Sequence, residues 1–139
     1  MRSRILQTIS FIIKPSANAS AIADLREAVG WNRADEDYPR ALQGYWTYVG
    51  GFTPENTLIA WCAVVSDGVR HAILLDVIVH PDYQRQGVGL RLVRSAIEHC
   101  LTHGIDIIHV DFEPHNTVFY EKCGFRTGLG GIYAIPPTQ

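Results

Sequence analysis

The sequence has little net charge and almost no lysine. Its 139 residues carry a formal net charge of −2 at pH 7, and only Lys14 and Lys122 are lysines. A domain that binds nucleic acid or an anionic membrane needs a basic surface, which this balance does not supply. We therefore expect neither nucleic acid nor a membrane as a partner.

Cysteine is scarce as well, and the few cysteines are far apart. Cys62, Cys100 and Cys123 are odd in number and form no Cys-x-x-Cys pair. This pattern argues against a disulfide framework and is typical of reduced thiols in a cytoplasmic protein. His99 and His103 are four residues apart, but the glutamate of a zinc-protease helix is missing, so we expect no metal.

Long apolar runs and a secretory leader pattern are lacking too. No apolar stretch approaches the length that crosses a bilayer, and polar residues interrupt the apolar ones that follow Arg2 and Arg4. The hydrophobic content of 47% and the charged content of 19% are those of a folded globular chain. We expect a single cytoplasmic domain over residues 1–139, because this length supports one core but not two.

The most informative stretch is a strand, a charged turn and a helix between residues 74 and 101. The run Leu74–Val79 predicts a strand buried on both faces, with Asp76 as its one acidic residue. Pro81 ends this strand because proline cannot donate to a ladder. Apolar residues then recur at helical spacing, namely Leu90, Val93, Ala96, Ile97, Cys100 and Leu101.

The turn Gln84-Arg85-Gln86-Gly87-Val88-Gly89 has the composition of an anion-binding loop. A helix start presents unpaired N–H groups and a partial positive charge. Gly87 and Gly89 let a ligand approach the backbone, and Arg85 adds planar donors suited to phosphate. The turn is not a Walker loop, and Leu92 stands where a dinucleotide fingerprint needs its third glycine. An ordinary tight turn is the alternative.

The remaining pattern predicts hairpins before this stretch and a strand and a helix after it. Strands are expected over residues 5–14, 46–52, 57–66, 71–79, 105–112 and 132–135, and further helices over 16–29, 38–44 and 116–123. Ser16 or Asn18 should cap the first helix and Asp37 the second, and Gly30 should end the first. The fourth and fifth strands should be parallel, because a helix connects them. The expected class is α/β (α+β), with a mixed, mostly antiparallel sheet of six or seven strands flanked by about four helices.

Two motifs resemble a known family. Gln84-x-x-Gly87-x-Gly89, preceded by Val79-x-Pro81, resembles the acetyl-CoA signature of the GCN5-related N-acetyltransferases (GNAT), and residues 116–125 resemble the second motif of that family. The resemblance covers about Leu6 to Ile135. Gly30-Trp31, residues 76–81 and residues 119–125 are most similar to small bacterial members and to the plant serotonin N-acetyltransferase-like group. The resemblance implies the GNAT fold, in which the fourth and fifth strands splay apart around the thioester arm of the cofactor.

The resemblance also implies where acetyl-CoA would bind. The loop and the helix start would hold its phosphates, and the pantetheine arm would pair with the preceding strand, whose amides are the expected oxyanion donors. Side chains of the second motif would face the cofactor. The expected cofactor-binding residues are Val77, Ile78, Val79, Arg85, Gln86, Gly87, Val88, Gly89, Leu90, Asn116 and Phe119.

Acetyl transfer from a thioester to an amine needs an acid for the leaving thiolate and an acceptor for the amine proton. Tyr120 is the expected acid, because a phenol with a pKa of about 10 is protonated at neutral pH and still donates to a thiolate. Asp76 is the best candidate for the base, because an acid inside an apolar strand costs free energy unless it is paired or functional. Asp111, Glu113 and a water chain are rival bases. Packing alone for Tyr120 and a structural role for Asp76 are the alternatives.

The sequence thus predicts an acetyl-CoA-dependent N-acetyltransferase that acts on a primary amine by direct attack in a ternary complex. The acceptor would be a small molecule or a peptide, and the plant-like resemblance favours an arylalkylamine. Trp31, Tyr45, Trp46, Tyr48 and Trp61 would either line its pocket or pack in the core. Dimers are frequent in the resembled family, so a homodimer is one of the states that the sequence leaves open. A non-catalytic acyl-CoA-binding or sensing domain and a nucleotide-dependent oxidoreductase are the other classes that the sequence leaves open.

Overall fold

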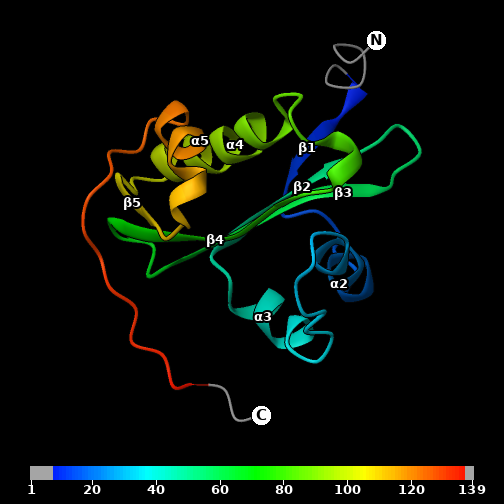
Figure 1. Cartoon of the computed structure of the whole chain (residues 1–139), viewed down its shortest axis with the longest axis horizontal. Coiled ribbons are helices and arrows are strands. Elements are labelled where there is room, and N and C mark those ends of the chain that lie inside the picture. Colours follow the sequence, from blue (N-terminus) through cyan, green and yellow to red (C-terminus); the bar gives the residue numbers. More distant parts are fainter. Residues whose placement is uncertain (1–7, 137–139) are drawn as a thin grey trace.

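The computed structural model describes residues 8–136, which form one five-stranded sheet with helices on both faces (Figure 1). The strands are adjacent in the order of the sequence: β1 (Ser10–Ile13), β2 (Thr47–Phe52), β3 (Leu58–Ser66), β4 (His71–Val79) and β5 (Ile107–Val110). The first four strands pair antiparallel, and β4 and β5 pair in parallel. The mixed sheet and its one parallel pair are as predicted.

Four α-helices and two short 3₁₀ turns complete residues 8–136. They are α2 (Ala19–Ala28), α3 (Tyr38–Gly44), η1 (Pro81–Tyr83), α4 (Val88–Thr102), η2 (Pro114–Asn116) and α5 (Thr117–Lys122). In Figure 1, α4 and α5 cover one face of the sheet, and α2 and α3 cover part of the other. None of these helices combines the length and the apolar character that crossing a bilayer requires.

The predicted helix caps differ in outcome. Asn18 caps α2 as predicted, because its Oδ1 accepts from the N–H groups of Ser20 and Ala21 at 2.8 and 3.3 Å. Gly30 follows the end of α2 with a left-handed backbone (φ 84°), also as predicted. Asp37 stands at the N-cap of α3, but its side chain makes no capping bond, so this prediction is wrong. Its backbone is already helical (φ −82°, ψ −38°), whereas a capping residue is normally extended.

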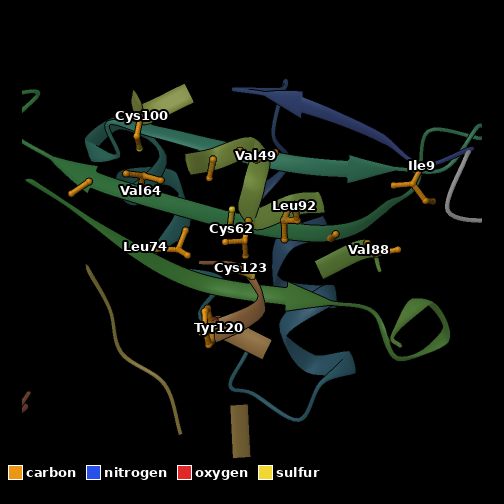
Figure 2. Close-up of a cluster of buried hydrophobic side chains, with 14 of the residues drawn as sticks. Ile9, Val49, Cys62, Val64, Leu74, Val88, Leu92, Cys100, Tyr120 and Cys123 are labelled. Atoms are coloured by element: carbon orange, nitrogen blue, oxygen red, sulfur yellow. The ribbon is translucent and has the colours of Figure 1, made fainter. Parts of the chain in front are cut away.

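Two hydrophobic clusters hold the layers together, one on each face of the sheet. The larger joins α4 and α5 to the sheet (Figure 2), and the smaller lies between the sheet and α2 and α3. Val93, Ala96 and Cys100 of α4 are fully buried in the larger cluster as predicted, and Leu90 and Ile97 pack against it. Leu101 is 54% exposed, so its place in the predicted stripe is wrong, and Leu92, which the prediction did not include, is fully buried. Each large aliphatic side chain buried here contributes about 1.5–3 kcal/mol to folding.

Three predicted strands are shorter than expected or missing. The first and fifth strands comprise only Ser10–Ile13 and Ile107–Val110, and residues 5–7 of the first prediction lie outside the described part of the chain. Residues 132–135 form no strand, and Ile132, Tyr133 and Ile135 are 74–97% exposed. The prediction of a last strand is wrong here because β-propensity forms a strand only beside a neighbouring strand.

β4 contains a bulge and then separates from β5. Trp61 pairs with Ile78 and Ala63 with Leu75, so one residue of β3 faces two of β4, Asp76 and Val77. The pairing with β5 ends at Leu74 and Val110, whereas β4 continues to Val79. The second half of β4 therefore borders a gap, as the resemblance implied. Of the run Leu74–Val79, which was predicted to be buried on both faces, only Leu74 and Ile78 are fully buried and the other four residues are partly exposed.

Candidate active site

The predicted anion loop lies between the end of β4 and the start of α4. The His80 N–H donates to the Ile59 carbonyl at 2.8 Å, and η1 turns the chain directly after this residue. Arg85 and Gly87 then take left-handed backbones, with φ of 61° and 84°. Gly87 is the N-cap of the 15-residue helix α4, and no side chain of the described residues caps the first turn. The N–H groups of that turn and the positive end of the helix are thus available to an anion.

Gly89 has a packing role that the sequence did not indicate. A Cβ at this position would lie 3.1 and 3.2 Å from Cε1 and Cζ of Phe119 and 3.5 Å from Cγ2 of Val79. α5 and the end of β4 therefore press on the first turn of α4, and a larger residue would displace it. Phe119, predicted to contact the cofactor, thus also fixes the helix start that would hold the phosphates.

Two glutamine side chains shape the loop. Gln84 Nε2 donates to the Val79 carbonyl at 2.9 Å, and Gln86 Nε2 donates to the Asp82 carbonyl at 3.2 Å. Gln86 Oε1 is buried and has no hydrogen-bond partner among the described residues. A buried acceptor without a partner costs about 1–3 kcal/mol, which a bound donor group would recover. Free amide donors beside an unpaired acceptor fit a ligand that contains both phosphates and amides, such as coenzyme A.

The backbone of β4 offers further groups to the gap. The His80 N–H bonds to β3, and alternate residues of a strand point their amides to the same neighbour, so Ile78 also faces β3. By the same alternation, Val77 and Val79 point their N–H groups away from β3 and towards the gap, whereas the Val79 carbonyl is already bonded to Gln84 Nε2. The Ile78 side chain is 2% exposed and belongs to the cluster under α2 and α3.

Tyr120 lies in the larger cluster (Figure 2), and three aromatic rings lie close to its own. Its ring centroid is 4.7 Å from that of Phe112, 4.9 Å from that of Phe119 and 5.8 Å from that of Phe125. Tyr120 is 6% exposed, and this burial raises its pKa to about 12. The phenol is therefore fully protonated at neutral pH and is a weaker acid than free tyrosine.

Asn116 stands one residue before α5 rather than in its first turn. It is the N-cap residue, with φ −97° and ψ 2°, and its side chain makes no capping bond to α5. The helix predicted over residues 116–123 begins at Thr117 and ends at Lys122. Asn116 is half-buried, so a ligand can reach its side chain.

Asp76 lies on the opposite face of the sheet from Tyr120, against α2 and α3. The Tyr38 hydroxyl donates to Asp76 Oδ2 at 2.9 Å, and Arg26 Nη1 lies 3.5 Å from the same oxygen. Arg26 Nη1 also donates to the Tyr38 hydroxyl at 3.1 Å. The Asp76 side chain is 31% exposed, so it is partnered but open to solvent. Sequence reasoning missed Arg26 and Tyr38, because no local motif signals a contact between residues so far apart along the chain.

The other candidates do not converge on one pocket. Asp111 and Glu113 are exposed after β5. Trp61 is fully buried against Tyr48. Trp46 packs on the other face, against His99 and His103 of α4. Trp31, which is 42% exposed, and the half-buried Tyr45 are the remaining aromatic candidates for contact with an acceptor.

Comparison with known proteins identifies the class to which this fold and site belong. Residues 16–125 match the family model described as "Acetyltransferase (GNAT) family". The chain therefore belongs to the GNAT family of acetyltransferases, and the acetyl donor of this family is acetyl-CoA.

Particular relatives place the chain within that family. It is 29% identical over 126 residues to an uncharacterized N-acetyltransferase, ycf52, of Gracilaria tenuistipitata var. liui, covering 86% of this chain and 69% of the relative. It is 32% identical to GCN5-related N-acetyltransferase 2, chloroplastic, of Arabidopsis thaliana, covering 59% of this chain but only 33% of that protein. The chain thus spans only about a third of this longer relative.

Solved structures share the fold over nearly the whole chain. A GNAT family protein, SP0256, of Streptococcus pneumoniae has a TM-score of 0.79 at 24% identity and covers 94% of this chain and 99% of its own. The aminoglycoside N-acetyltransferase AAC(6')-Iy, solved in complex with CoA, has a TM-score of 0.73 at 13% identity, covering 94% and 95%. At these identities the likeness concerns the fold.

Proposed function

We propose that this protein transfers the acetyl group of acetyl-CoA to a primary amine of a small molecule or a peptide, by direct attack in a ternary complex. The observation that carries the proposal is the half of β4 that borders the gap. At its end lies an uncapped helix start, and on its far side lies a partly exposed carboxylate. Acetyl-CoA would supply an activated thioester, and the residues of the chain bind, orient and exchange protons.

The loop and its neighbours would hold the cofactor. Backbone N–H groups of residues 86–90, with the Arg85 guanidinium, would bind the pyrophosphate. The gap-facing amides of Val77 and Val79 would pair with the pantetheine arm and donate to the developing oxyanion. Asn116 and Phe119 would border the cofactor from the α5 side.

The two proton-handling residues work from opposite faces of the sheet. Asp76 would take a proton from the acceptor ammonium, which makes the nitrogen a nucleophile. Tyr120 would donate its hydroxyl proton to the sulfur that leaves. The amine loses two protons overall; one balances the new S–H bond and the other passes to solvent.

The finer identity of the acceptor is also a proposal. The plant serotonin N-acetyltransferase-like resemblance favours an arylalkylamine, and the exposed Trp31 ring and the half-buried Tyr45 near Asp76 support an aromatic acceptor. Relatives have names as different as "Histone acetyltransferase TAP1" of Glycine max and "Glucosamine 6-phosphate N-acetyltransferase" of Schizosaccharomyces pombe. An amine panel should therefore contain arylalkylamines, amino sugars and a lysine peptide.

The compartment and the assembly belong to the same proposal. The three cysteines are free and buried, which supports a reducing compartment such as the cytoplasm. A homodimer is one of the oligomeric states to be tested. Fluorescent fusions and light scattering would test these two points.

Calorimetry and thiol release test the function. Acetyl-CoA should bind whereas NAD and ATP should not, and thiol should be released with at least one amine of the panel. Arg85→Glu should weaken acetyl-CoA binding by about tenfold, or about 1.4 kcal/mol. Tyr120→Phe should lower turnover about 10²-fold while binding survives. Acetyl-CoA binding without thiol release on any amine would instead indicate a sensing domain.

A further inference from the structure

We propose that Arg26 and Tyr38 are positioning residues that hold Asp76 by its Oδ2 atom, so that Oδ1 accepts the proton of the acceptor amine. This inference rests on the proposed acetyl transfer to an amine. The contacts, the backbone geometry and the electrostatics of the three residues carry it.

Both partners bind the same carboxylate oxygen. Tyr38 donates to Oδ2 at 2.9 Å and Arg26 Nη1 lies 3.5 Å from Oδ2, and the two partners are joined to each other at 3.1 Å. Oδ1 is left as the oxygen that can meet a ligand. One hydrogen bond and one ion-pair contact on the same oxygen restrict the plane of the carboxylate and thus the direction in which Oδ1 points.

The partners are themselves held in place. Arg26 Nε donates to the Asn32 carbonyl at 2.5 Å, and the guanidinium carbon lies 5.3 Å from the centre of the Trp31 ring. Tyr38 is 2% exposed in the cluster under α2 and α3. Their conformational freedom is therefore already lost on folding, and this preorganisation lets a side chain orient its neighbour.

The backbone of Asp76 shows the same constraint. Asp76 sits in the β4 bulge with φ of 53°, a left-handed conformation that is strained for a residue other than glycine. A bulge re-aims a side chain, and here it turns the carboxylate towards α2 and α3. Contacts from two separate helices at this one residue are what a positioned carboxylate requires.

The groups that face Asp76 are one cation and two phenols. The charged and titratable groups of the described residues that face Asp76 are Arg26 from α2, Tyr38 from α3 and Tyr45 just after α3. Burial, followed by the Asp76 charge, raises the pKa of Tyr38 and of Tyr45, so both stay neutral at pH 7. Arg26 is the one cation among them, and its Nη1 lies beside the carboxylate oxygen that the Tyr38 hydroxyl also contacts.

The proton step balances within the site. An N–H bond of the ammonium breaks and an O–H bond forms on Oδ1, while the electron pair stays on nitrogen. Asp76 then releases the proton to water, because its side chain is 31% exposed. Asp76 thus passes the proton from the acceptor amine to water.

The test compares Tyr38→Phe, Arg26→Met and Arg26→Lys with wild type, using the amine found active in the panel. Loss of a partner from Oδ2 should lower kcat about tenfold and leave the calorimetric affinity for acetyl-CoA unchanged. Arg26→Lys should restore part of the kcat that Arg26→Met loses, because it returns a cation to the same place. The NMR resonance of the Asp76 carboxyl carbon at pH 7.5, measured without any substrate, should move in Tyr38→Phe and in Arg26→Met because the carboxylate is held differently.

Arg33→Met is the matched control. Arg33 lies on the connector between α2 and α3 and pairs with Asp24, Glu27 and Asp35 at 2.7, 3.1 and 3.0 Å, but not with Asp76. Arg33→Met should leave kcat and the Asp76 carboxyl resonance unchanged. Wild-type kcat and an unmoved carboxyl resonance in Arg26→Met and Tyr38→Phe would overturn the inference while the proposed function stands. If no amine releases thiol from wild type, the proposed function has failed, and the carboxyl resonance still decides whether Arg26 and Tyr38 hold Asp76.

Discussion

On the α4/α5 face of the sheet the candidate site consists mainly of backbone groups, whereas on the α2/α3 face it consists of charged and hydroxyl side chains. The first contains the N–H groups after Gly87, and the second contains Asp76 with Arg26 and Tyr38. β4 lies between them and contributes amides to one and a carboxylate to the other. In the proposed function, cofactor binding and amine activation therefore lie on opposite faces of β4.

The two faces of the candidate site should lose their function for different reasons. A site made of backbone groups tolerates many side chains but fails when the backbone moves. Its most sensitive residues are therefore Gly89 and Phe119, whose ring packs against it. A side-chain site tolerates small backbone shifts but fails when one partner of the network is removed. Substitutions on the two faces should therefore separate binding from turnover.

Gly89→Val should have the largest effect, and on the α4/α5 face. The new Cβ would lie 3.1 Å from the Phe119 ring, and its methyl groups would force the first turn of α4 away from α5 and β4. Coenzyme A affinity should fall by at least about tenfold, and the free energy of unfolding should fall by about 1–3 kcal/mol. Calorimetry and urea unfolding measure the two quantities.

Gly44→Ala is the control for that substitution. Gly44 is the last residue of α3, no described atom lies within 4 Å of the place that a Cβ would take, and no positive φ is involved. Alanine should change stability by less than about 1 kcal/mol, since it is the better helix former. Unchanged coenzyme A affinity in Gly89→Val would show that the helix start does not hold the cofactor.

Asn18→Ala should have an intermediate effect, on the α2/α3 face. It removes the two capping bonds at the start of α2 and should lower the free energy of unfolding by about 1 kcal/mol. Asp37→Ala makes the matched comparison, because Asp37 occupies an N-cap position without a capping bond and should change stability by less than about 0.5 kcal/mol. Neither substitution should alter coenzyme A affinity in the folded protein. Equal losses from the two variants would contradict this difference between the caps.

The contrast between the α4/α5 face and the α2/α3 face also explains which features could be predicted from the sequence. The loop, its glycines and the stripe of α4 are local signals, so they were predictable from residues that are neighbours in the chain. The pairing of β4 with β5 followed from one connecting helix. Arg26 and Tyr38 could not be linked to Asp76, since residues 50 and 38 positions away meet it only after the sheet and both helices have packed.

Two wrong predictions have a related cause. The last strand was expected at residues 132–135 from β-propensity, but a strand also needs a partner, and partners are a tertiary property. Capping by Asp37 was expected from residue type, but its backbone is already helical, which composition does not reveal. Gly89 was assigned to ligand approach, whereas the contact of its turn with Phe119 depends on where α5 docks.

The substitution His99→Gln should have the smallest effect, a change in the pH dependence of stability that arises on the α4/α5 face alone. The His99 ring packs against Trp46 at 5.4 Å, and burial, with the nearby His103 and Lys14, lowers its pKa below 6.5. The unfolded chain then binds a proton at a higher pH than the folded chain, so stability is complete above about pH 6.5 and falls as the pH drops below it. Urea unfolding at pH 7.5 and 5.5 should show a smaller loss in His99→Gln than in wild type, by less than the effect of Asn18→Ala. His115→Gln, at an exposed position in η2, should keep the wild-type loss, and an identical loss in His99→Gln would mean that the Trp46 contact does not disfavour the charged ring.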